Sequence, residues 1–491
     1  MPDRKLSDKV WGSRDVVPRF IDNGIELDDT SFWGGNILQD KKGTFHLYVC
    51  GWPESSQKGH MQWPESVVYH ATAKKLHGPY HITDTVGPGH NPEAHLLDDG
   101  RMMVYVIDAC YLGDSYSGPW KKSRINFDPR DRRIIEGLSN VTFARRQDGS
   151  YLAVCRGGGV WISRDGADNY RQITERRIYP PVKGEFEDPV VWCDSLQYHL
   201  IVNDWLGRIA YYKRSLDGVH WIVEPGEAYI PGISRHKDGT VENWFKYERA
   251  KVFQDPQGRP VQMNFAVIDT IKWEDHGNDN HSSKNICLPL RKELLLSVLN
   301  QEPINSSTST VQLRIKAEKG FKPAKQLNIP SLRFGSYSEV NFGRGARPLS
   351  WHKDGNDLIV TFEDHATGIT EEEFAPKLLG RDRNGEPVMG YALLPYVNYR
   401  PAILSARRPV FDPAQGSWQV EVENFGLSSS SADTRILILS DGRKLAEATI
   451  PALAPYASTT LTIKGNTPVT NAKTEVHFLL KDRQTGETLF D

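Results

Sequence analysis

The segment NVTFARRQDGSYLAVCRG (140–157) holds two short apolar runs on either side of a polar turn at Asp148 and Gly149. Apolar runs that flank an Asp-Gly turn are typical of a β-hairpin. The same unit occurs five times before residue 300, at intervals of roughly 45 to 60 residues, and such a period indicates a repeat architecture. The other copies are GNILQDKKGTFHLYVCGW (35–52), NPEAHLLDDGRMMVYVIDA (91–109), DPVVWCDSLQYHLIVNDW (188–205) and ERAKVFQDPQGRPVQMNFAVID (248–269).

Further strand-like segments follow the hairpins and complete each unit. GVWISRDGADNYRQI (159–173) and RIAYYKRSLDGVHWIV (208–223) share a Ser-x-Asp-Gly turn between two such strands. Five units of four strands predict a five-bladed β-propeller over residues 1–300. Helical periodicity is confined to KNICLPLRKELLLSVL (284–299), the only segment for which we expect a helix of any length.

The pattern changes from about residue 301. The polar segment QEPINSSTST (301–310) predicts a linker, and alternating segments such as VQLRIKAEKG (311–320) predict a β-sandwich-like accessory region over 301–400. Alternation and turns after Trp418 predict a small immunoglobulin-like β-sandwich over 401–491. The expected fold class is therefore all-β, a propeller followed by β-rich accessory modules.

Composition narrows the classes of partner. The 491 residues include 60 Lys and Arg against 62 Asp and Glu, a formal net charge of -2. The chain therefore lacks the positive field that holds nucleic acid or an anionic bilayer, and we expect neither as a partner. No stretch approaches the ~20 apolar residues that span a bilayer. We expect a cytoplasmic protein, or a periplasmic or secreted one if a leader has been removed.

Cysteine usage points to buried thiols. The chain has five cysteines, and Cys50, Cys110 and Cys155 each end an apolar strand-like run. Such residues behave as small apolar side chains more often than as disulfides or metal ligands.

The innermost strands of a propeller open onto its central channel, so the residues that begin them should ring one end of the axis. These residues are all polar: Asn36, Asn91, Asn140, Asp188 and Glu248. By a similar register argument, the ends of the second strands face the same mouth, at Asp108, Arg156, Asp204 and Asp269. Polar axial residues that only satisfy backbone groups are an alternative explanation.

Two short motifs carry a resemblance to known enzymes. The unit D-P-x-x-W-x-x-x-x-x-Y-H-L at Asp188 and the segment Tyr247-Glu248-Arg249 resemble blades of the five-bladed propeller glycoside hydrolases of families 43, 32 and 117. In these families an early carboxylate acts as base or nucleophile, a middle Asp orients the sugar, and a later Glu donates the proton. The resemblance implies the orienting role for Asp188 and the acid role for Glu248.

The first blade departs from the family pattern. Asn36 stands where these families have an Asp, and an amide cannot act as a base. We expect Asp29, in the loop before TSFWGGN (30–36), to supply the missing carboxylate, with Glu93 as the main competitor. Glycoside hydrolysis needs one protonated and one ionised carboxyl group, and a funnel that brings like charges together raises one pKa as required.

The remaining candidates are expected to bind substrate. Trp33, with Trp52 or Trp205, is a candidate stacking platform for sugar rings, and Arg156 or Arg249 suits an acidic or sulfated substituent. The other predicted substrate-binding residues are Asn36, His90, Asn91, Glu93, Asn140 and Asp204. The spacing in GHNPEAH (89–95) does not fit a helical zinc site, so we expect no catalytic metal or other cofactor, although a structural ion in the channel is compatible with the fold.

Three functions fit these observations. The leading hypothesis is an exo-acting glycoside hydrolase that releases a terminal sugar from an oligo- or polysaccharide; the resemblance favours inversion. The second is a polysaccharide lyase that uses Tyr or His as base and Arg to neutralise a uronate. The third is a carbohydrate-binding propeller without catalysis, which the missing first-blade Asp favours.

Overall fold

The computed structural model describes residues 22–135, 138–204, 209–229, 232–236, 238–242, 244–279, 281–468 and 473–490, and also the short strands β1 (Val10–Trp11) and β2 (Arg19–Phe20). Regular structure in this part of the chain is almost all β-strand, so the prediction of a mostly β protein is confirmed. The described helices are the short elements η1 (Gly59–Glu65), α1 (Pro323–Gln326), α2 (Tyr337–Val340) and η2 (Asp364–Ala366).

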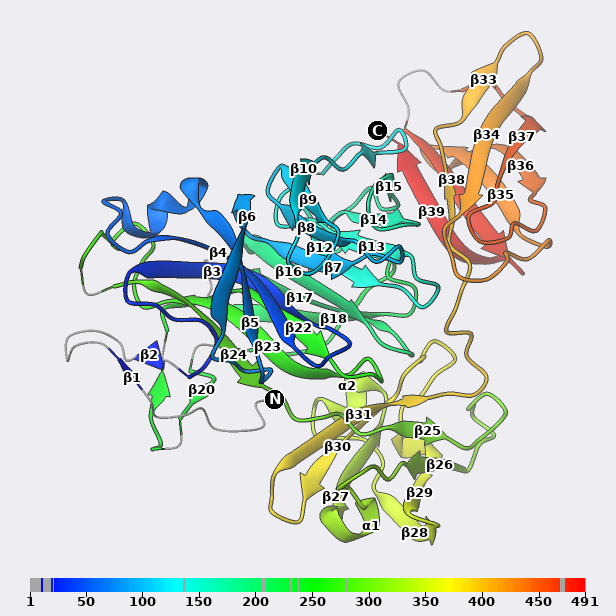
Figure 1. Cartoon of the computed structure of the whole chain (residues 1–491). Coiled ribbons are helices and arrows are strands. Elements are labelled where there is room, and N and C mark those ends of the chain that lie inside the picture. The colour runs from blue at the N-terminus through cyan, green and yellow to red at the C-terminus, as the bar shows by residue number, and fades with distance from the viewer. Residues whose placement is uncertain are drawn as a thin grey trace.

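Five sheets, antiparallel except for one short pair of strands in the third, follow one another along the first 289 residues (Figure 1). The first contains β3 (Thr30–Gln39), β4 (Phe45–Pro53), β5 (Val67–Ala73) and β6 (His81–Pro88). The second contains β7 (Glu93–Leu96), β8 (Met102–Val106), β9 (Ala109–Gly113) and β10 (Trp120–Ser123). The third contains β12 (Thr142–Arg145), β13 (Tyr151–Val154), β14 (Val160–Ser163) and β15 (Tyr170–Gln172), with β11 (Phe127–Asp128) parallel to β15.

The fourth sheet contains β16 (Phe186–Cys193), β17 (Tyr198–Asp204), β18 (Ile209–Ser215) and β19 (Ile222–Val223). The pair β20 (Ser234–Arg235) and β21 (Val241–Glu242) precedes the fifth sheet, which contains β22 (Lys246–Gln254), β23 (Pro260–Ile268) and β24 (Ser283–Pro289). The hairpins expected from the repeat are the first two strands of each of the five sheets.

The first and the last of these sheets meet. The segment before β3 lies along β24, where Ile25 forms an antiparallel bridge with Asn285. The Asn23 amide donates to the carbonyl of Cys287 (2.7 Å) and accepts from its N–H (2.9 Å). Strand β3 contacts both β7 and β22, and β16 contacts both β12 and β22. The first strands of the five sheets, β3, β7, β12, β16 and β22, therefore surround a common centre.

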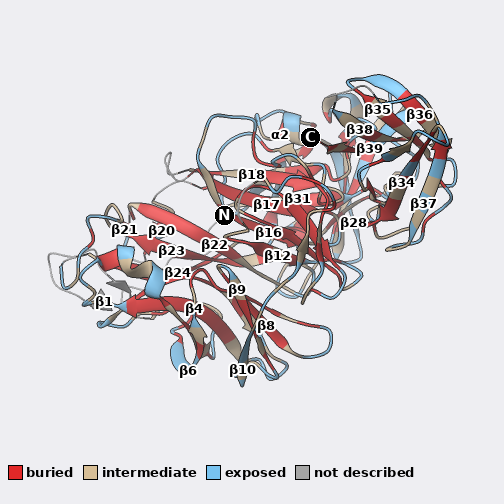
Figure 2. Cartoon of the chain, turned by 90° about the horizontal axis from the view of Figure 1, so that it is seen from above, coloured by how far each residue is buried: buried red, intermediate tan, exposed pale blue. Residues whose placement is uncertain are grey.

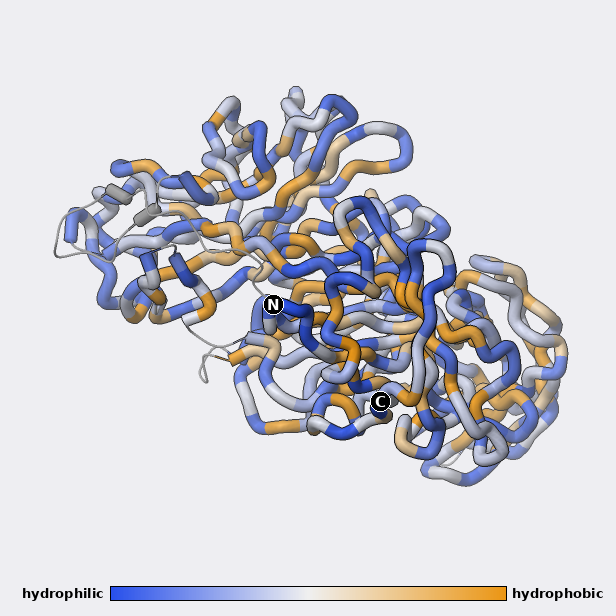
Figure 3. Tube along the Cα trace, turned by 90° about the horizontal axis from the view of Figure 1, so that it is seen from below, coloured by the Kyte–Doolittle hydropathy of each residue, from blue (hydrophilic) through white to orange (hydrophobic). Residues whose placement is uncertain are grey.

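Apolar side chains fill the space between consecutive sheets. One buried cluster joins Trp33 and Trp52 of the first sheet to Val104 of the second, and another joins Leu152 of the third to Leu200 of the fourth. Figure 2 shows the buried residues concentrated in the strands and the exposed residues in loops and outer edges. Figure 3 shows short hydrophobic and hydrophilic stretches alternating along the chain, as expected for many short strands.

The helix expected over 284–299 is wrong. Residues 283–289 form strand β24, and every residue of this strand is buried. Because the strand is covered on both faces, polar residues such as Lys284 and Asn285 are buried with the apolar ones, and the sequence lacks the alternation that distinguishes a half-buried strand from a helix. Pro289, which has no N–H to donate, ends the strand.

The C-terminal part builds further sheets. A seven-stranded sheet comprises β25 (Leu296–Val298), β26 (Thr310–Ile315), β27 (Leu327–Gly335), β28 (Pro348–Asp354), β29 (Asp357–Glu363), β30 (Lys377–Asp382) and β31 (Pro387–Leu393). Two four-stranded sheets share one core: β32 (Leu404–Ala406), β33 (Val410–Asp412), β34 (Ser417–Asn424) and β37 (Ser458–Lys464) form one, and β35 (Arg435–Ser440), β36 (Arg443–Thr449), β38 (Thr474–Leu480) and β39 (Arg483–Phe490) form the other.

Buried arginines connect both C-terminal units to the first five sheets. Arg130 pairs with Glu423 of β34 at 3.0 Å, and its side chain is almost fully buried. Arg214 of β18 pairs with Glu224 and donates to the carbonyl of Ala375 (3.2 Å). In Figure 1 the two units lie beside the five sheets as separate bodies.

No described helix is both long enough and apolar enough to cross a membrane.

Candidate active site

In three of the five sheets the first strand is interrupted by a β-bulge near its beginning. The pairing register shifts between Trp33 and Asn36 in β3, between Glu187 and Val190 in β16, and between Glu248 and Lys251 in β22. A bulge leaves an extra residue on one strand and redirects the side chains beside it. Within each bulge the first of the two unpaired residues has a positive φ, at Gly34, Asp188 and Arg249; in β3 the second, Gly35, has one as well (93°).

The positive φ identifies one equivalent residue in the first strand, or just before it, in each of the five sheets. We call this residue the ring position. These residues are Gly34 (64°), Asn91 (53°), Asn140 (48°), Asp188 (53°) and Arg249 (49°). Gly, Asn and Asp adopt this conformation readily, whereas Arg seldom does. Asn36 and Glu248 were predicted as members of this ring, and the bulges show that Asn36 lies two residues after the ring position and Glu248 one residue before it.

Three layers of residues follow from this register. The upper layer, one residue before the ring, consists of Trp33, His90, Ser139, Glu187 and Glu248, and all five line one cavity of about 540 Å³. The ring contributes Asn91, Asn140 and Asp188 to the same cavity. The lower layer, two residues after the ring, consists of Asn36, Glu93, Thr142, Val190 and Lys251, and none of these lines the cavity.

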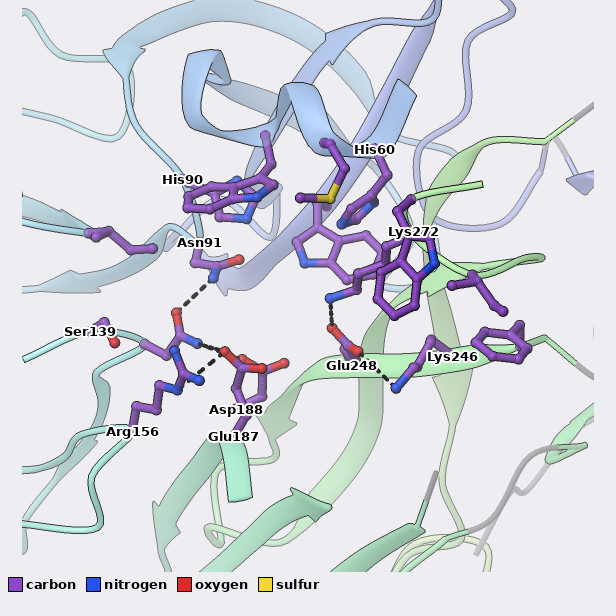
Figure 4. Close-up of a pocket in the computed structure, with 18 residues that line it drawn as sticks. His60, His90, Asn91, Ser139, Arg156, Glu187, Asp188, Lys246, Glu248 and Lys272 are labelled. Atoms are coloured by element: carbon purple, nitrogen blue, oxygen red, sulfur yellow. Dashed lines mark hydrogen bonds and ion pairs between the residues drawn. The ribbon is translucent and has the colours of Figure 1, made fainter. Parts of the chain in front are cut away.

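Glu187 is the carboxyl group whose environment favours a bound proton. Burial raises the pKa of Glu187 to about 7, and the charges of Asp188 and Glu248 act in the same direction. The Asn140 amide donates to its Oε1 at 3.1 Å, and Nε of Arg156 lies 3.5 Å from the same atom. Figure 4 shows Glu187 beside Asp188, facing Arg156. This carboxyl group can therefore donate a proton near neutral pH.

Asp188 is held rigidly. Its Oδ1 accepts from the Asn140 amide (3.0 Å) and pairs with Nη1 of Arg249 (3.1 Å), and its Oδ2 accepts from the backbone N–H of Arg249 (3.2 Å). Both oxygens are therefore engaged by neighbouring sheets. An aspartate in this setting suits orientation and charge balance better than proton transfer.

Glu248 lies between two ammonium groups. Lys272 forms an ion pair with Oε2, and Lys246 lies 3.8 Å from Oε1. Although burial opposes the charge on Lys272, the Glu248 carboxylate raises the pKa of this lysine above its ordinary value. Figure 4 shows both lysines directed at Glu248. Glu248 thus lies beside two cations, whereas Glu187 lies beside two carboxylates and 3.5 Å from Arg156.

Two neutral imidazoles, those of His60 and His90, also line the cavity. His60 belongs to η1, and its Nδ1 lies 2.9 Å from the Ser283 hydroxyl; His90 Nδ1 lies 3.0 Å from the Ser66 hydroxyl. Burial lowers the pKa of both histidines well below the ordinary value, and the Lys272 charge adds to this effect. Both rings are therefore uncharged hydrogen-bonding groups at neutral pH.

A buried ion pair lies in the lower layer. Lys251 of the lower layer pairs with Glu93, which also accepts from the Thr142 hydroxyl (3.1 Å) and from the N–H of Phe143 (2.9 Å). Burial lowers the pKa of Lys251 to about 8 even though Glu93 opposes the shift. Glu93 was predicted to face the substrate, or to replace Asp29; it lies two residues after the ring position instead and does not line the cavity.

Three further predicted site residues lie outside the cavity. Asp29 is exposed in the turn before β3, where it accepts from the Thr30 hydroxyl at 2.8 Å, so the loop does not lower it into the pocket. Asn36 exchanges two hydrogen bonds with the backbone of Ala94. Asp204 accepts from the backbone N–H of Glu185 at 3.3 Å, and Arg156 is the only second-strand end of its predicted set that lines the described cavity.

Some of the tryptophan side chains lie in the hydrophobic core, and others line the cavity. Trp52 is buried in the core between the first two sheets, and Trp205 lies outside the described residues. Trp33 lines the cavity, but the Lys272 ammonium lies 4.9 Å from its ring centre and covers one face. Trp63 and Trp273 also line it, and Trp273 is 63% exposed. These two indoles were missed in the sequence, as were Glu187, Lys246 and Lys272.

One of the missed residues left a signal in the sequence. The segments F-E-D-P (186–189) and Y-E-R-A (247–250) both place Glu directly before the ring residue, so aligning them identifies Glu187 as the partner of Glu248. Lys272 and Trp273 lie in the segment after β23, which has no periodic pattern. No group of three or more His, Cys, Asp or Glu side chains within the described part of the chain has the geometry of a metal site. All five cysteines are free, and Cys50, Cys110 and Cys155 are buried as predicted.

Comparison with known proteins found similarity in solved structures. Neither a model of a protein family nor a curated protein matched the sequence. An α-L-arabinofuranosidase from Lactobacillus brevis is 10% identical, with 53% of this chain and 91% of that chain covered and a TM-score of 0.37. An endo-arabinase from Bacteroides thetaiotaomicron is 12% identical, with 55% and 97% covered and a TM-score of 0.35. A GH43 protein from Bacillus licheniformis is 10% identical, with 94% and 89% covered and a TM-score of 0.33. The chain is thus similar to solved glycoside hydrolases, among them members of family 43.

Proposed function

We propose that this protein is a glycoside hydrolase whose catalytic groups lie in the cavity at the centre of the five sheets. The observation that carries the proposal is a pair of carboxyl groups in opposite environments: Glu187, with its pKa raised to about 7, and Glu248, between Lys246 and Lys272. Hydrolysis of a glycosidic bond requires such a pair, one group to protonate the leaving oxygen and one to act as base or nucleophile.

We assign the roles from these environments. Glu187 donates the proton to the glycosidic oxygen, Glu248 is the second catalytic carboxylate, and Asp188 orients the sugar. The sequence had suggested Glu248 as acid, but Glu248 lies between two lysine ammonium groups, whereas burial and carboxylate neighbours raise the pKa of Glu187 to about 7 and so disfavour its anion. Asp188 keeps the orienting role expected from the Asp-Pro motif.

The proposal also covers the architecture of the five sheets, the end of the substrate that is cleaved and the stereochemistry of the reaction. We interpret the five sheets as the blades of a five-bladed propeller, with residues 301–400 and 401–491 as accessory modules. A cavity of about 540 Å³ accommodates a chain end, which favours exo-acting release of a terminal sugar. We further propose inversion, with Glu248 activating water; the anomer first released, observed by NMR, tests this step.

The first experiment compares the wild type with Glu187→Gln, Asp188→Asn and Glu248→Gln on defined neutral and acidic oligosaccharides, with chromatographic detection of released sugars. Glu227→Gln, at an exposed position outside the cavity, is the matched control. We expect release of a monosaccharide by the wild type and the control, and a loss of about a hundredfold or more in the three site variants. Release that all three site variants retain would place the chemistry elsewhere.

A lyase is the second candidate, because the neutral His60 and His90 line the same cavity as Lys246 and Arg156. Its product, an unsaturated uronate, absorbs in the ultraviolet, whereas a hydrolysis product has no such chromophore. A carbohydrate-binding protein without turnover is favoured by Gly34, which leaves the ring position of the first sheet without a carboxylate. Binding of oligosaccharide with no product from the wild type supports this third candidate.

A further inference from the structure

The ring residues of four sheets form a chain of hydrogen bonds. The Asn91 amide donates to Oδ1 of Asn140 (2.7 Å), and the Asn140 amide donates to Oδ1 of Asp188 (3.0 Å). Asp188 in turn pairs with Nη1 of Arg249 at 3.1 Å. The ring position of the first sheet is Gly34, which has no side chain to join Arg249 to Asn91. The chain of hydrogen bonds is therefore open at the first sheet.

The Asp188 carboxylate determines the direction of this chain. Its oxygens accept from Arg249 and from Asn140, so Asn140 must turn its amide nitrogen toward Asp188 and its Oδ1 toward Asn91. Asn91 must then donate through its own amide nitrogen, and its Oδ1 is left on the side of Gly34. The two ends of the chain therefore differ: Asn91 offers an acceptor, and Arg249 offers N–H donors.

Both ends are buried and unsatisfied. Asn91 Oδ1, Arg249 Nε and Arg249 Nη2 have no hydrogen-bond partner within the described part of the chain. The two residues are only 6% and 1% exposed. A buried polar group without a partner costs free energy, and native structures seldom leave one unsatisfied. We therefore expect a bound group to satisfy these atoms.

The space between the two ends is small and adjoins the cavity. A Cβ built on Gly34 would lie 3.5 Å from Oδ1 of Asn91 and 3.8 Å from Cγ of Arg249, and no other residue would lie closer than these two. These are ordinary contact distances, so the gap has room for one non-hydrogen atom. Asn91 lines the cavity, as does Trp33, which directly precedes Gly34 (Figure 4).

The chemistry of the two ends selects the group that fits. The group must accept from the Arg249 guanidinium and donate to Oδ1 of Asn91, and a hydroxyl does both through a single oxygen. A carboxylate or a sulfate ester has acceptors alone and would place an oxygen against Oδ1 of Asn91. A methylated hydroxyl has no proton to donate. The oxygen of a sugar hydroxyl and that of a water molecule both meet the requirement.

We propose that the gap at Gly34 binds one free hydroxyl group of the sugar in the cavity, which accepts from Arg249 and donates to Asn91. The inference rests on the part of the proposed function that places a sugar in this cavity, and it names the group of the sugar that the ring recognises. The alternative is that water alone fills the gap and the sugar does not reach it.

The test measures binding by calorimetry, without turnover, on hexose and pentose monosaccharides and their monodeoxy forms. Gly34→Asn supplies an amide that can close the ring, because Asn adopts a positive φ at two other ring positions. Gly34→Ala fills the gap with a methyl group that cannot hydrogen-bond. Gly355→Asn and Gly355→Ala are the matched controls: Gly355 has a φ of 60°, is exposed, and has no atom within 4 Å of a built Cβ.

We expect the wild type to bind at least one of these sugars and to bind one of its monodeoxy forms about 10- to 100-fold more weakly. Gly34→Asn and Gly34→Ala should bind the parent sugar as weakly as that deoxy form, because the new side chain takes the place of the hydroxyl. Both Gly355 variants should keep the preference of the wild type. The thermal midpoint of Gly34→Asn should exceed that of Gly34→Ala by more than the same pair differs at Gly355.

The opposing results are equally specific. If both Gly34 variants keep the wild-type preference for the hydroxyl, the gap belongs to water alone and the inference is overturned. It is also overturned if the wild type binds none of the sugars or ignores every deoxy substitution, or if the Asn and Ala midpoints differ equally at Gly34 and Gly355. Oligosaccharide turnover is scored separately: a hydroxyl preference without product supports the inference although the hydrolase fails, and turnover with no such preference leaves the hydrolase intact.

Discussion

Replacing Glu187 by Gln should abolish proton donation and, above neutral pH, stabilise the fold. Burial and two neighbouring carboxylates raise the pKa of Glu187 from 4.5 to about 7. At about 1.4 kcal/mol per pH unit, this difference corresponds to about 3 kcal/mol. A group with the ordinary pKa would be protonated in well under 1% of molecules at pH 7, whereas Glu187 is protonated in about half, a gain of about 150-fold.

The sign of the stability effect follows from the two pKa values. Below pH 4.5 the carboxyl group is protonated in both the folded and the unfolded chain, so it contributes no difference. As pH rises toward 7 the unfolded chain ionises first, and the folded state loses stability; above pH 7 the full cost of about 3 kcal/mol remains. Gln resembles the protonated acid and avoids this cost, so the variant should gain stability at pH 8.5 and gain none at pH 4.5.

The assay pairs thermal unfolding at these two pH values with kinetics. We expect a higher unfolding midpoint for Glu187→Gln at pH 8.5 only, and a kcat about a hundred- to ten-thousandfold lower on substrates with sugar leaving groups. Activated aryl leaving groups need little protonation and should lose far less. Wild-type activity should fall as pH rises through about 7. Glu248→Gln is the control for which we expect the opposite change in stability. It leaves Lys272 without its carboxylate partner, so its unfolding midpoint should fall. A midpoint difference for Glu187→Gln that is the same at both pH values would refute the reasoning.

Three further changes test the surrounding structure. In Gly35→Ala the new Cβ would lie 2.1 Å from the carbonyl oxygen of Tyr48, so the thermal midpoint should fall clearly, and an unchanged midpoint would contradict the bulge. Lys251→Met leaves Glu93 buried without its cation and should cost about 3 kcal/mol or more in denaturant unfolding, most of which adding Glu93→Gln should restore; no recovery would argue against the pair. Trp273→Ala removes the exposed indole at the mouth and should raise KM about 10-fold for oligosaccharides but not for aryl monosaccharides; equal effects on both would exclude a role in holding the leaving sugar.

The sequence predicted the hairpins well because each is a local feature. An Asp-Gly turn such as Asp148-Gly149 and the alternation around it depend only on neighbouring residues, and the strands on either side lie where expected. The helix prediction for 284–299 was wrong for the opposite reason. Strand β24 is covered on both faces by other parts of the chain, and this burial removes the alternation that distinguishes a strand. Long-range packing, not local propensity, determines its structure.

The site was predicted in part. Asp188, Asn91, Asn140 and Arg156 do line the cavity, because the start or end of a strand can be read from a hairpin. Asp29 was expected there only because the family has a carboxylate in that blade, and no local feature of the turn directs it inward. The loop that carries Lys272 and Trp273 has no repeat counterpart, so its position depends on contacts such as Gly59 of η1 against the backbone of Asp275, where a Cβ would lie 1.9 Å from the carbonyl oxygen.

The bulge explains why the cavity holds adjacent charged residues. In a regular strand Glu187 and Asp188 would point to opposite faces. At the bulge, where Asp188 has a positive φ, both side chains line the cavity; in the fifth sheet Glu248 lines it, while Arg249, which also has a positive φ, pairs with Asp188. The ring residues then neutralise each other across the centre, since Asp188 pairs with Arg249. The layer above is left with two glutamates that differ in their surroundings, because only one of them is flanked by two lysines. One backbone irregularity, repeated in two sheets, thus creates both the rigid base of the cavity and the unequal pair of acids above it.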